Sequence, residues 1–335
     1  MPINRQVRLK SRPSGIPQAE HFELAEAPVP ELGDKQFLVR NEFLSVEPAM
    51  RGWVSAVANY STPVAIGEVM RSFSAGTVVK SRHPGFAEGD QVMGMLGWQD
   101  YAVSDGSNIT RKLKEADLPL SLSLGVLGLN GVTAYFGLLD LGLPKPGDTV
   151  VVSTAAGSVG SAVGQIAKLM GCRTVGITGG ATKVALCNDA FGYDAAIDYK
   201  AGDLDAALKA ACPRGVDVYF DNTAGAISDT VIQQIATGAR IVICGTASIA
   251  SWDPWPLGPR VERHILVKRA RMSGLLIFDY AHRYEEAVGR LAQWIRDGKL
   301  QYREDIVDGI EHAPGAIAEL YRGENLGKRL IRLKA

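Results

Sequence analysis

The sequence predicts an α/β protein whose central region forms a doubly wound parallel sheet, with shorter β-rich segments before and after it. Between residues 126 and 300, short apolar segments alternate with helical patterns, which is the order of elements that builds a parallel sheet. These segments are apolar throughout, as expected of strands that are covered on both faces. Residues 1–125 and 301–335 instead show short strands separated by Gly, Pro and Asp, as in a small barrel or sandwich. We therefore expect one domain, 126–300, to be inserted into a second domain formed by 1–125 and 301–335.

The expected elements follow from these patterns. In the central region we expect strands at 149–153, 173–177, 195–198, 216–220, 240–244 and 271–277, with a helix after the first strand through Met170 and another near 181–191. In the flanking regions we expect strands at 36–45, 67–70, 75–80, 91–95, 301–308 and 328–333, and a helix at 312–322.

Composition and charge exclude several classes of function. The chain has 335 residues, of which 36 are basic and 36 acidic, so nothing in its overall charge favours nucleic acid or an anionic membrane as a partner. A net charge of zero permits self-association. The N-terminus lacks the apolar core of a secretion signal and no apolar run approaches about 20 residues, so we expect a cytoplasmic protein. The four cysteines form no CxxC pair, and we expect no disulfide.

A glycine-containing turn after the first central strand predicts a dinucleotide site. Residues 150–160 read VVVSTAAGSVG, which gives Ala155, Gly157 and Gly160 the spacing of a dinucleotide fingerprint, with Ala at the first glycine position. Gly157 would let the backbone approach a pyrophosphate, and Gly160 would let the following helix pack closely on the strand. The helix N-terminus would offer free N–H groups to the phosphates. The alternative is a structural turn without a ligand, but the flanking strand and helix favour the nucleotide.

The segment after the second strand favours NADPH over NADH. An NAD site normally places an acidic residue about 20 residues after the glycines, where it binds the ribose 2′-hydroxyl. After Ile177 the chain reads TGGATK, which has no acid, and Lys183 would attract a 2′-phosphate. Taken alone, Lys183 could equally be a solvated lysine on a helix face, so the missing acid decides the prediction. Tyr199, just after the third strand, is a second candidate for contact with the phosphate or the ribose.

Over nearly its whole length the sequence resembles the zinc-free branch of the medium-chain dehydrogenase/reductase superfamily. That branch contains the leukotriene B4 12-hydroxydehydrogenase/prostaglandin reductases, plant double-bond reductases and bacterial NADPH-dependent curcumin reductases. The resemblance rests on FLSVEPAMR at 43–51, NGVTAYFGL at 130–138, AAGSVG at 155–160, GQIAK at 164–168, YFDN at 219–222, CG at 244–245 and NLGK at 325–328. It implies a Rossmann domain inserted in a β-rich, GroES-like substrate-side domain. It also implies NADPH as the cofactor and a homodimer that pairs through the sheet edge at 271–277.

The resemblance further implies a set of cofactor-binding residues. These are Asn130, Thr133, Ala155, Ala156, Gly157, Ser158, Val159, Gly160, Thr178, Lys183, Tyr199, Asn222, Cys244, Gly245, Leu276 and Asn325. The turn from Ala156 to Gly160 would hold the pyrophosphate, and Asn222 would lie along the riboses with the Cys-Gly pair. Leu276 would back the nicotinamide and Asn325 would close over the cofactor. Asn130 and Thr133 would lie at the pocket floor, whereas the adjacent Tyr135 and Phe136 are expected in the core.

Two departures from the family pattern concern the substrate pocket. Relatives often read PYMR where this chain has PAMR at 48–51, and many carry a tyrosine after the Cys-Gly pair where this chain reads TASIASWDP at 246–254. Both changes remove an aromatic hydroxyl that could bind the substrate carbonyl, so Tyr60 becomes the candidate catalytic donor. The expected pocket residues are Met50, Arg51, Trp53, Trp98 and Trp252. Their aromatic and apolar character favours a hydrophobic small-molecule substrate.

The resemblance implies an NADPH-dependent reduction of the carbon–carbon double bond of α,β-unsaturated ketones or aldehydes. Hydride would reach the β-carbon, and negative charge would develop on the carbonyl oxygen. We expect no metal, because residues 1–125 contain no cysteine and only two isolated histidines, His21 and His83, whereas a catalytic zinc needs three protein ligands. Quinone or carbonyl reduction on the same scaffold is an alternative. A non-catalytic NADPH-binding protein is an alternative from another class.

Overall fold

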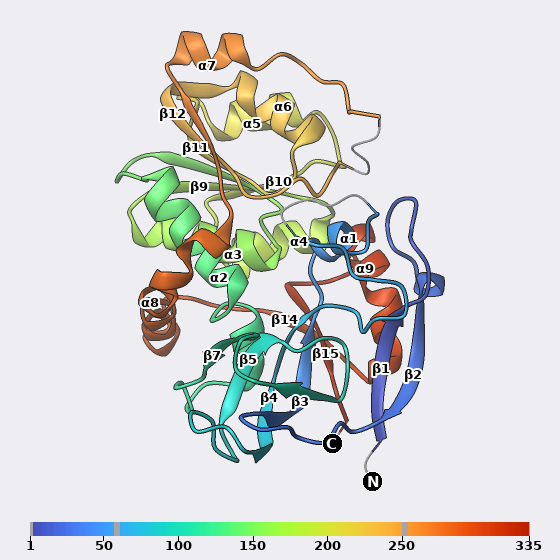
Figure 1. Ribbon diagram of the computed structural model, residues 1–335. Helices are drawn as coiled ribbons and strands as arrows, with labels where there is room; N and C mark the ends of the chain where they lie inside the picture. The colour runs from blue at the N-terminus through green and yellow to red at the C-terminus, as the bar shows by residue number, and fades with distance from the viewer. Residues whose placement is uncertain (1–2, 57–60, 250–253, 335) are drawn as a thin grey trace. The chain divides into compact units, whose positions relative to one another are not determined.

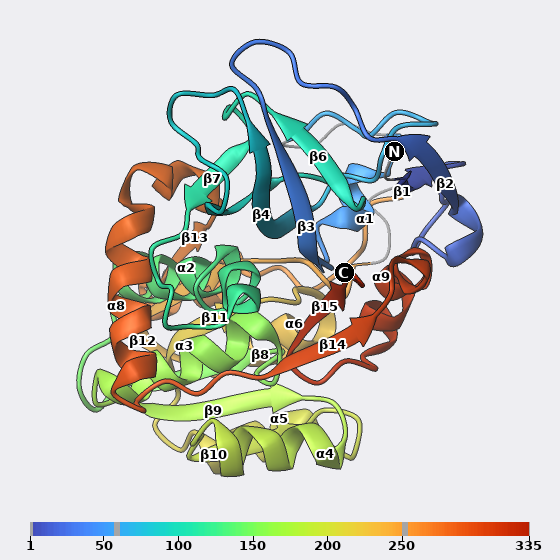
Figure 2. The same ribbon diagram turned by 90° about the horizontal axis from the view of Figure 1, so that it is seen from below.

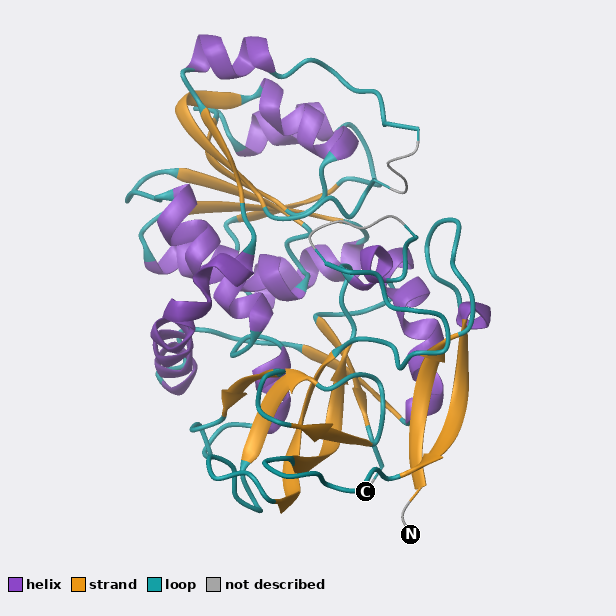
Figure 3. Cartoon of the chain, in the orientation of Figure 1, coloured by secondary structure: helices purple, strands orange, loops and turns teal. Residues whose placement is uncertain are grey.

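The computed structural model describes residues 3–56, 61–249 and 254–334. The chain divides into two compact units, of which the first comprises Met1–Gly125 and Glu304–Ala335 and the second comprises Val126–Arg303. The second boundary lies three residues beyond the one expected at 300/301. Strands and loops dominate the first unit, whereas helices and strands alternate in the second (Figure 3).

The second unit contains a six-stranded parallel sheet, as the sequence predicts. Its strands are β8 (Thr149–Ser153), β9 (Arg173–Thr178), β10 (Ala195–Asp198), β11 (Val216–Asp221), β12 (Ile235–Ile243) and β13 (Arg271–Gly274), and their order in the sheet is β10-β9-β8-β11-β12-β13. All neighbouring pairs are parallel. The strand order reverses between β8 and β11, and in such sheets ligands bind beside the carboxyl ends of the strands at this point. The predicted Rossmann architecture is confirmed.

Helices cover both faces of this sheet. They are α2 (Leu129–Phe136), α3 (Ser158–Leu169), α4 (Ala181–Ala185), α5 (Leu204–Ala211), α6 (Gly225–Gln233), α7 (Glu262–Lys268) and α8 (Tyr284–Arg296), with π-helical turns at Gly137–Gly142 and Leu186–Ala190 and a 3-10 helix at Ile277–Arg283. In Figure 1, α2 and α3 lie on one face and α5 and α6 on the other. Apolar side chains of α5 and α6 share one buried core with the strands, and Val163 and Ile166 of α3 have no exposed surface. Cover on both faces explains why these strands are apolar throughout. Within the described ranges, no helix is long and apolar enough to span a bilayer.

The first unit is built on an antiparallel sheet with one parallel pair. Its strands are β3 (Phe37–Ser45), β4 (Phe73–Ser81), β5 (Gln91–Met95), β6 (Tyr101–Ser104), β7 (Ile109–Lys112), β14 (Glu304–Asp308) and β15 (Lys328–Arg332), in the order β14-β15-β3-β4-β5-β7 with β6 also paired to β3. A separate hairpin pairs β1 (Ile3–Leu9) with β2 (Phe22–Pro28). The helices are α1 (Met50–Trp53) and α9 (Ala313–Arg322), with 3-10 turns at Ala19–His21, Leu120–Leu124 and Ile310–His312. The C-terminal strands β14 and β15 belong to the same sheet as β3, which also shows in Figure 2.

Several predicted strands differ from those observed. The segment Gly67–Met70 was expected to be a strand and is a turn, in which Val69 pairs with Arg8 at a single bridge. Gly67 has a φ of +86°, which interrupts an extended backbone there. The predicted strand at 271–277 ends at Gly274, because the chain enters a 3-10 helix at Ile277. In contrast, β12 starts at Ile235, five residues before the expected start.

Candidate active site

The turn between β8 and α3 has the geometry that the fingerprint predicts. Gly157 is the N-cap of α3, and the preceding turn passes through Thr154, whose φ is +54°. A Cβ atom on Gly160 would lie 2.3 Å from the Thr154 carbonyl oxygen, and one on Gly157 would lie 2.9 Å from the Thr154 methyl group. Both glycines are therefore required by close approach of the turn to the helix.

The start of α3 is held firmly in place. The Tyr193 hydroxyl donates to the Gly160 carbonyl oxygen at 2.7 Å, and the Tyr193 ring occupies the space beside Gly164, where a Cβ atom would approach it to 2.2 Å. The first N–H groups of a helix have no partner within the helix, and α3 directs them toward the carboxyl edge of the sheet. Ser158 and Val159, which begin α3, are half-buried, whereas Ala155 and Ala156 are buried. The backbone at the start of α3 has the arrangement that a pyrophosphate would need, and its role as the phosphate site stays a prediction.

The ends of β9 and β10 bring together the residues predicted near the 2′-phosphate. Thr178 ends β9 and is buried, and the Tyr199 N–H donates to its carbonyl oxygen at 3.1 Å. Gly179 and Gly180 follow, and α4 carries a half-buried Lys183 in its first turn. A Cβ atom on Gly179 would lie 3.0 Å from the Tyr199 ring, which shows how closely the two strand ends approach.

Two neighbours of this corner were not predicted. The Lys200 ammonium lies 5.8 Å from the centroid of the Tyr199 ring, and both side chains lie beside Gly179, so a second lysine belongs to this strand-end region. Asp198 ends β10, and its carboxylate accepts hydrogen bonds from the backbone N–H groups of Gly180 and Lys200, which hold its pKa below the ordinary value. The Asp198 carboxylate is therefore already hydrogen-bonded to the backbone. The position of Lys200, directly after Tyr199 in the sequence, was a signal that could have been used.

Three further predicted residues meet where the strand order reverses. The Asn222 side-chain amide donates to the Ser153 carbonyl oxygen at 2.7 Å, and the Asn222 N–H donates to the Ser153 hydroxyl at 2.8 Å. The N–H groups of Cys244 and Gly245 donate to the Asp221 carbonyl oxygen at 2.8 and 3.1 Å. Burial raises the pKa of the Cys244 thiol to about 12, so this cysteine is a neutral thiol near neutral pH and no nucleophile.

Sequence reasoning missed Asp221, which organises this loop. Its side chain is fully buried, and one carboxylate oxygen accepts hydrogen bonds from the backbone N–H groups of Thr223 and Ala224, both at 2.9 Å. The Tyr219 hydroxyl reaches the same oxygen at 2.9 Å. The Asp therefore fixes the backbone that carries Asn222. The motif YFDN at 219–222 contained this signal, since a buried acid after a strand needs backbone donors.

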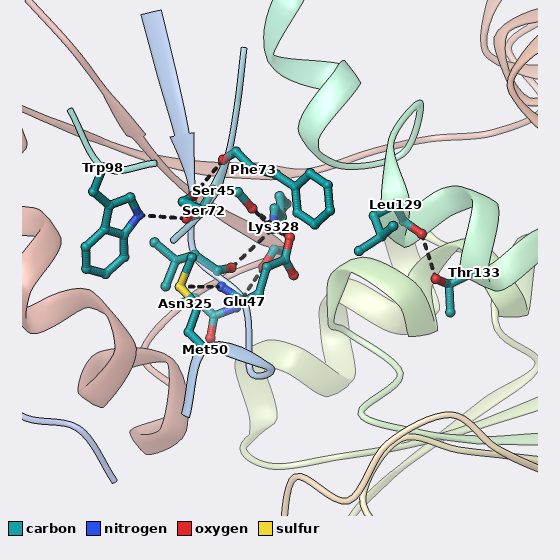
Figure 4. A network of polar contacts seen from close by, with 12 residues as sticks. Ser45, Glu47, Met50, Ser72, Phe73, Trp98, Leu129, Thr133, Asn325 and Lys328 are labelled. Carbon is teal, nitrogen blue, oxygen red and sulfur yellow. Dashed lines mark hydrogen bonds and ion pairs between the residues drawn. The ribbon is translucent and has the colours of Figure 1, made fainter. Parts of the chain in front are cut away.

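The remaining cofactor candidates of the second unit lie on or near α2 and the 3-10 helix. Asn130 and Thr133 are buried, and the Thr133 hydroxyl donates to the Leu129 carbonyl oxygen at 2.6 Å (Figure 4). Leu276 precedes the 3-10 helix and is 37% exposed. Phe136 has no exposed surface, as expected of a core residue, and Tyr135 is half-buried.

In the first unit, α1 carries three of the predicted pocket residues. Met50 and Trp53 are buried, and the Arg51 guanidinium lies 4.9 Å from the centroid of the Tyr321 ring. Trp98 has no exposed surface, and its indole N–H donates to the Ser45 carbonyl oxygen at 3.0 Å, which favours a structural role. The side-chain amide of the buried Asn325 donates to the Gly327 carbonyl oxygen at 2.7 Å. The predicted residues Tyr60 and Trp252 lie outside the described residues.

Metal ligands are not gathered anywhere in the part of the chain that the structure describes. No group of three or more His, Cys, Asp or Glu side chains there is placed to hold a metal ion. The absence of zinc from the protein stays a prediction.

Comparison with known proteins places the chain in a family. Residues 5–111 match the family described as N-terminal domain of oxidoreductase, and residues 158–293 match the one described as zinc-binding dehydrogenase. The chain is 44% identical to the NADPH-dependent curcumin reductase of Escherichia coli, over 98% of this chain and 97% of that protein. It is 37% identical to a NADP(+)-dependent 2-alkenal reductase of Nicotiana tabacum, over 98% and 97% of the two chains. The crystal structure of CurA with NADPH from Vibrio vulnificus superposes with a TM-score of 0.93, at 43% identity, over 99% of both chains.

The chain belongs to the medium-chain dehydrogenase/reductase superfamily. Its relatives within that superfamily are the double-bond reductases, so the resemblance inferred from the sequence motifs is confirmed. The β-rich first unit is the GroES-like domain of this family, and the second unit is its Rossmann domain.

Proposed function

We propose that this member of the NADPH-dependent double-bond reductases reduces the carbon–carbon double bond of hydrophobic α,β-unsaturated ketones and aldehydes. The observation that carries the proposal is the similarity, over nearly the full length of both chains, to reductases named for curcumin and for 2-alkenals. The corner formed by Lys183, Tyr199 and Lys200 supports NADPH, because two cations there would attract a 2′-phosphate.

The chain's own residues would hold the cofactor by its phosphates and riboses. Gly157 to Gly160 would offer backbone N–H groups to the pyrophosphate, and Lys183 would bind the 2′-phosphate. Asn222 and the Cys244–Gly245 backbone, which Ser153 and Asp221 hold in place, would lie along the riboses. When bound, NADPH supplies the hydride that adds to the β-carbon of the enone.

The substrate oxygen needs hydrogen-bond donors, because negative charge develops on it as the hydride is transferred. We propose Tyr60 as the donor, since this chain has Ala49 where relatives often have a tyrosine. A conjugated enone needs less polarisation than an isolated carbonyl, because its β-carbon is already electrophilic. Arg51 on α1, which is partly exposed, would border the substrate pocket, whereas Met50 and Trp53 of the same helix are buried and would support it. Trp252 stays a second candidate for a pocket residue.

The proposed function is tested by mixing the purified protein with NADPH and a panel of possible acceptors. The panel contains a long-chain 2-alkenone, a 2-alkenal, a quinone and a saturated aldehyde, and the loss of NADPH absorbance is followed. We expect turnover with the two enones and little with the saturated aldehyde. Faster turnover with the quinone would favour the quinone reductase alternative. Thermal stabilisation by NADPH without any oxidation would favour a non-catalytic NADPH-binding protein.

We also propose that the protein is a cytoplasmic homodimer. The strand β13 lies at the edge of the parallel sheet, as the sequence predicts, and an unpaired strand edge is a template for pairing with another chain. Met272 on β13 and Leu266 on the preceding helix α7 are apolar side chains that are 38% and 78% exposed. Exposed apolar side chains on a strand at a sheet edge are typical of a protein interface.

A further inference from the structure

A buried ionic cluster lies in the first unit, beside the start of α1. The ammonium group of Lys328, the first residue of β15, donates to the Ser45 hydroxyl at 2.7 Å, the Val46 carbonyl oxygen at 3.1 Å and a Glu47 carboxylate oxygen at 2.6 Å (Figure 4). The Ser45 hydroxyl donates to the same Glu47 oxygen at 2.6 Å. The side chains of Lys328 and Glu47 are only 4% and 7% exposed.

The cluster satisfies the hydrogen bonds of its ammonium group, but a buried ion pair of this kind is weak evidence for stability. An ammonium group has three protons, and all three have an acceptor here. Burial lowers the pKa of Lys328, and Glu47 opposes that effect. Replacing a buried ion pair by apolar groups of similar volume is often neutral or stabilising. The position of this ion pair in the fold therefore explains its presence better than a contribution to stability does.

The three acceptors are consecutive residues between the end of β3 and the start of α1. Other bonds hold the same stretch as well. The Trp98 indole and the Ser72 hydroxyl donate to the Ser45 carbonyl oxygen at 3.0 and 2.9 Å, and the Tyr321 hydroxyl donates to the Pro48 carbonyl oxygen at 2.9 Å. The Met50 N–H then donates to the Glu47 carbonyl oxygen at 3.1 Å, and α1 follows directly. The orientation of α1 therefore depends on the backbone that Lys328 holds.

We propose that Lys328 is a positioning residue for the substrate, acting through the backbone of Ser45–Glu47 on the orientation of α1 and so on its partly exposed side chain Arg51. The inference rests on the proposed function, which assigns Arg51 of α1 to the substrate pocket. Lys328 itself is not proposed to touch substrate or NADPH. In the turn between β3 and α1, its ammonium group takes the place of a backbone hydrogen-bond donor to the Val46 carbonyl oxygen.

A second carboxyl group, that of Glu304, lies near the cluster and has a hydrogen-bond partner of its own. Glu304 on β14 is paired in register with Lys328, and it accepts a hydrogen bond from the Ser121 hydroxyl at 2.8 Å. Burial raises the pKa of Glu304. Glu47, which touches the ammonium group directly, is therefore the partner to neutralise when Lys328 is replaced.

The test compares single and double variants. Lys328→Met alone leaves Glu47 buried without its cation and is expected to lower the melting temperature. The double variant Lys328→Met/Glu47→Gln removes both charges, so we expect it to fold and to melt within a few degrees of the wild type. It still lacks the bonds to Ser45 and Val46. The matched control is Arg332→Met, which removes an ion pair with Asp308 on the same two strands where both side chains are about half exposed.

We expect the double variant to bind NADPH with a Kd within about twofold of the wild type, since Lys183 and the turn at Gly157–Gly160 are unchanged and the Asn325 amide keeps its bond to the Gly327 carbonyl oxygen. Its kcat/KM for a 2-alkenone should fall at least about tenfold, mostly through KM, and the control should keep the wild-type value. A double variant that binds NADPH normally and keeps kcat/KM within about threefold of the wild type overturns the proposal.

Hydrogen exchange separates this proposal from the proposed function. The amides of Trp53 and Val54 bond to the Ala49 and Met50 carbonyl oxygens within α1, and they should exchange faster in the double variant than in the wild type. If the wild-type protein turns over no enone, the proposed function fails, but exchange at α1 is still measurable. Unchanged exchange in the double variant overturns the positioning role whatever the substrate is.

Discussion

The side-chain amide of Asn222 donates to the backbone oxygen of Ser153 at 2.7 Å, and this bond joins the carboxyl ends of β11 and β8, the two strands between which the sheet order reverses. Asp221 holds the other side of the same loop through the backbone N–H groups of Thr223 and Ala224. Two polar side chains thus shape the strand ends where an open α/β sheet binds its ligand.

The assignment of the 2′-phosphate corner predicts a selective loss of NADPH affinity. Replacing Lys183 by Ala removes a charge-assisted bond worth about 1.5–3 kcal/mol, so NADPH should bind about 10- to 100-fold more weakly while NADH changes little. Titration of both cofactors by fluorescence measures the difference. Lys209→Ala, which removes an exposed lysine paired with Asp205 on α5, is the matched control and should affect neither cofactor. An equal loss for NADPH and NADH in Lys183→Ala contradicts the assignment.

Close packing at the phosphate turn predicts that Gly160 tolerates no side chain. In Gly160→Ala the new Cβ atom would meet the Thr154 carbonyl oxygen at 2.3 Å, so the start of α3 must move. We expect a loss of about 1–3 kcal/mol in the free energy of unfolding and a clear loss of NADPH affinity. The control is Gly289→Ala in α8, where nothing lies within 4 Å of the new atom and a gain of about 0.5–1 kcal/mol is expected. Normal stability and affinity in Gly160→Ala would refute the packing argument.

The sequence predicted the second unit better than the first for a physical reason. Parallel strands buried on both faces are apolar throughout, so segments such as 149–153 and 173–177 stand out from the helices between them. In the first unit, the hairpin of β1 and β2 was missed because its residues alternate between buried and exposed with many charges, as in Phe22–Pro28. The segment Gly67–Met70 was wrongly predicted to be a strand, because the sequence alone does not reveal that Gly67 adopts a positive φ.

In the candidate site, too, local sequence patterns were predictive and contacts between distant residues were missed. A glycine spacing predicts the phosphate turn, because the close contact of Gly160 with Thr154 excludes any other residue. Lys200 and Asp221 were missed because their roles depend on which strand ends become neighbours. The Lys328 cluster joins residues more than 280 positions apart in the chain, so no local pattern could reveal it.

The chemistry proposed here predicts that activity does not depend on zinc. Residues 1–125 supply no cysteine, and no cluster of metal-ligating side chains occurs among the residues that the structure describes. Elemental analysis of the purified protein should find no stoichiometric zinc, and prolonged treatment with a chelator should leave enone turnover unchanged. One zinc per chain, lost together with activity on chelation, would show that the prediction is wrong.

The exposed edge of the parallel sheet predicts a dimer that a single charge can weaken. Light scattering at micromolar concentration should give twice the 35.8 kDa of one chain. Met272→Glu places a carboxylate on β13 in each copy, and like charges that meet at an interface should shift the protein toward monomer. Ile66→Glu, which changes an exposed apolar side chain of the first unit, should leave the mass unchanged. A wild-type mass near that of one chain contradicts the proposal.

The position to which hydride is transferred tests the proposed reaction most directly. The protein is incubated with NADPH carrying deuterium at the transferred C4 position and with a long-chain 2-alkenone, and the product is analysed by NMR and mass spectrometry. Reduction of the conjugated double bond predicts a saturated ketone with deuterium at the β-carbon. An allylic alcohol with deuterium at the carbinol carbon would contradict double-bond reduction and show that the protein is a carbonyl reductase.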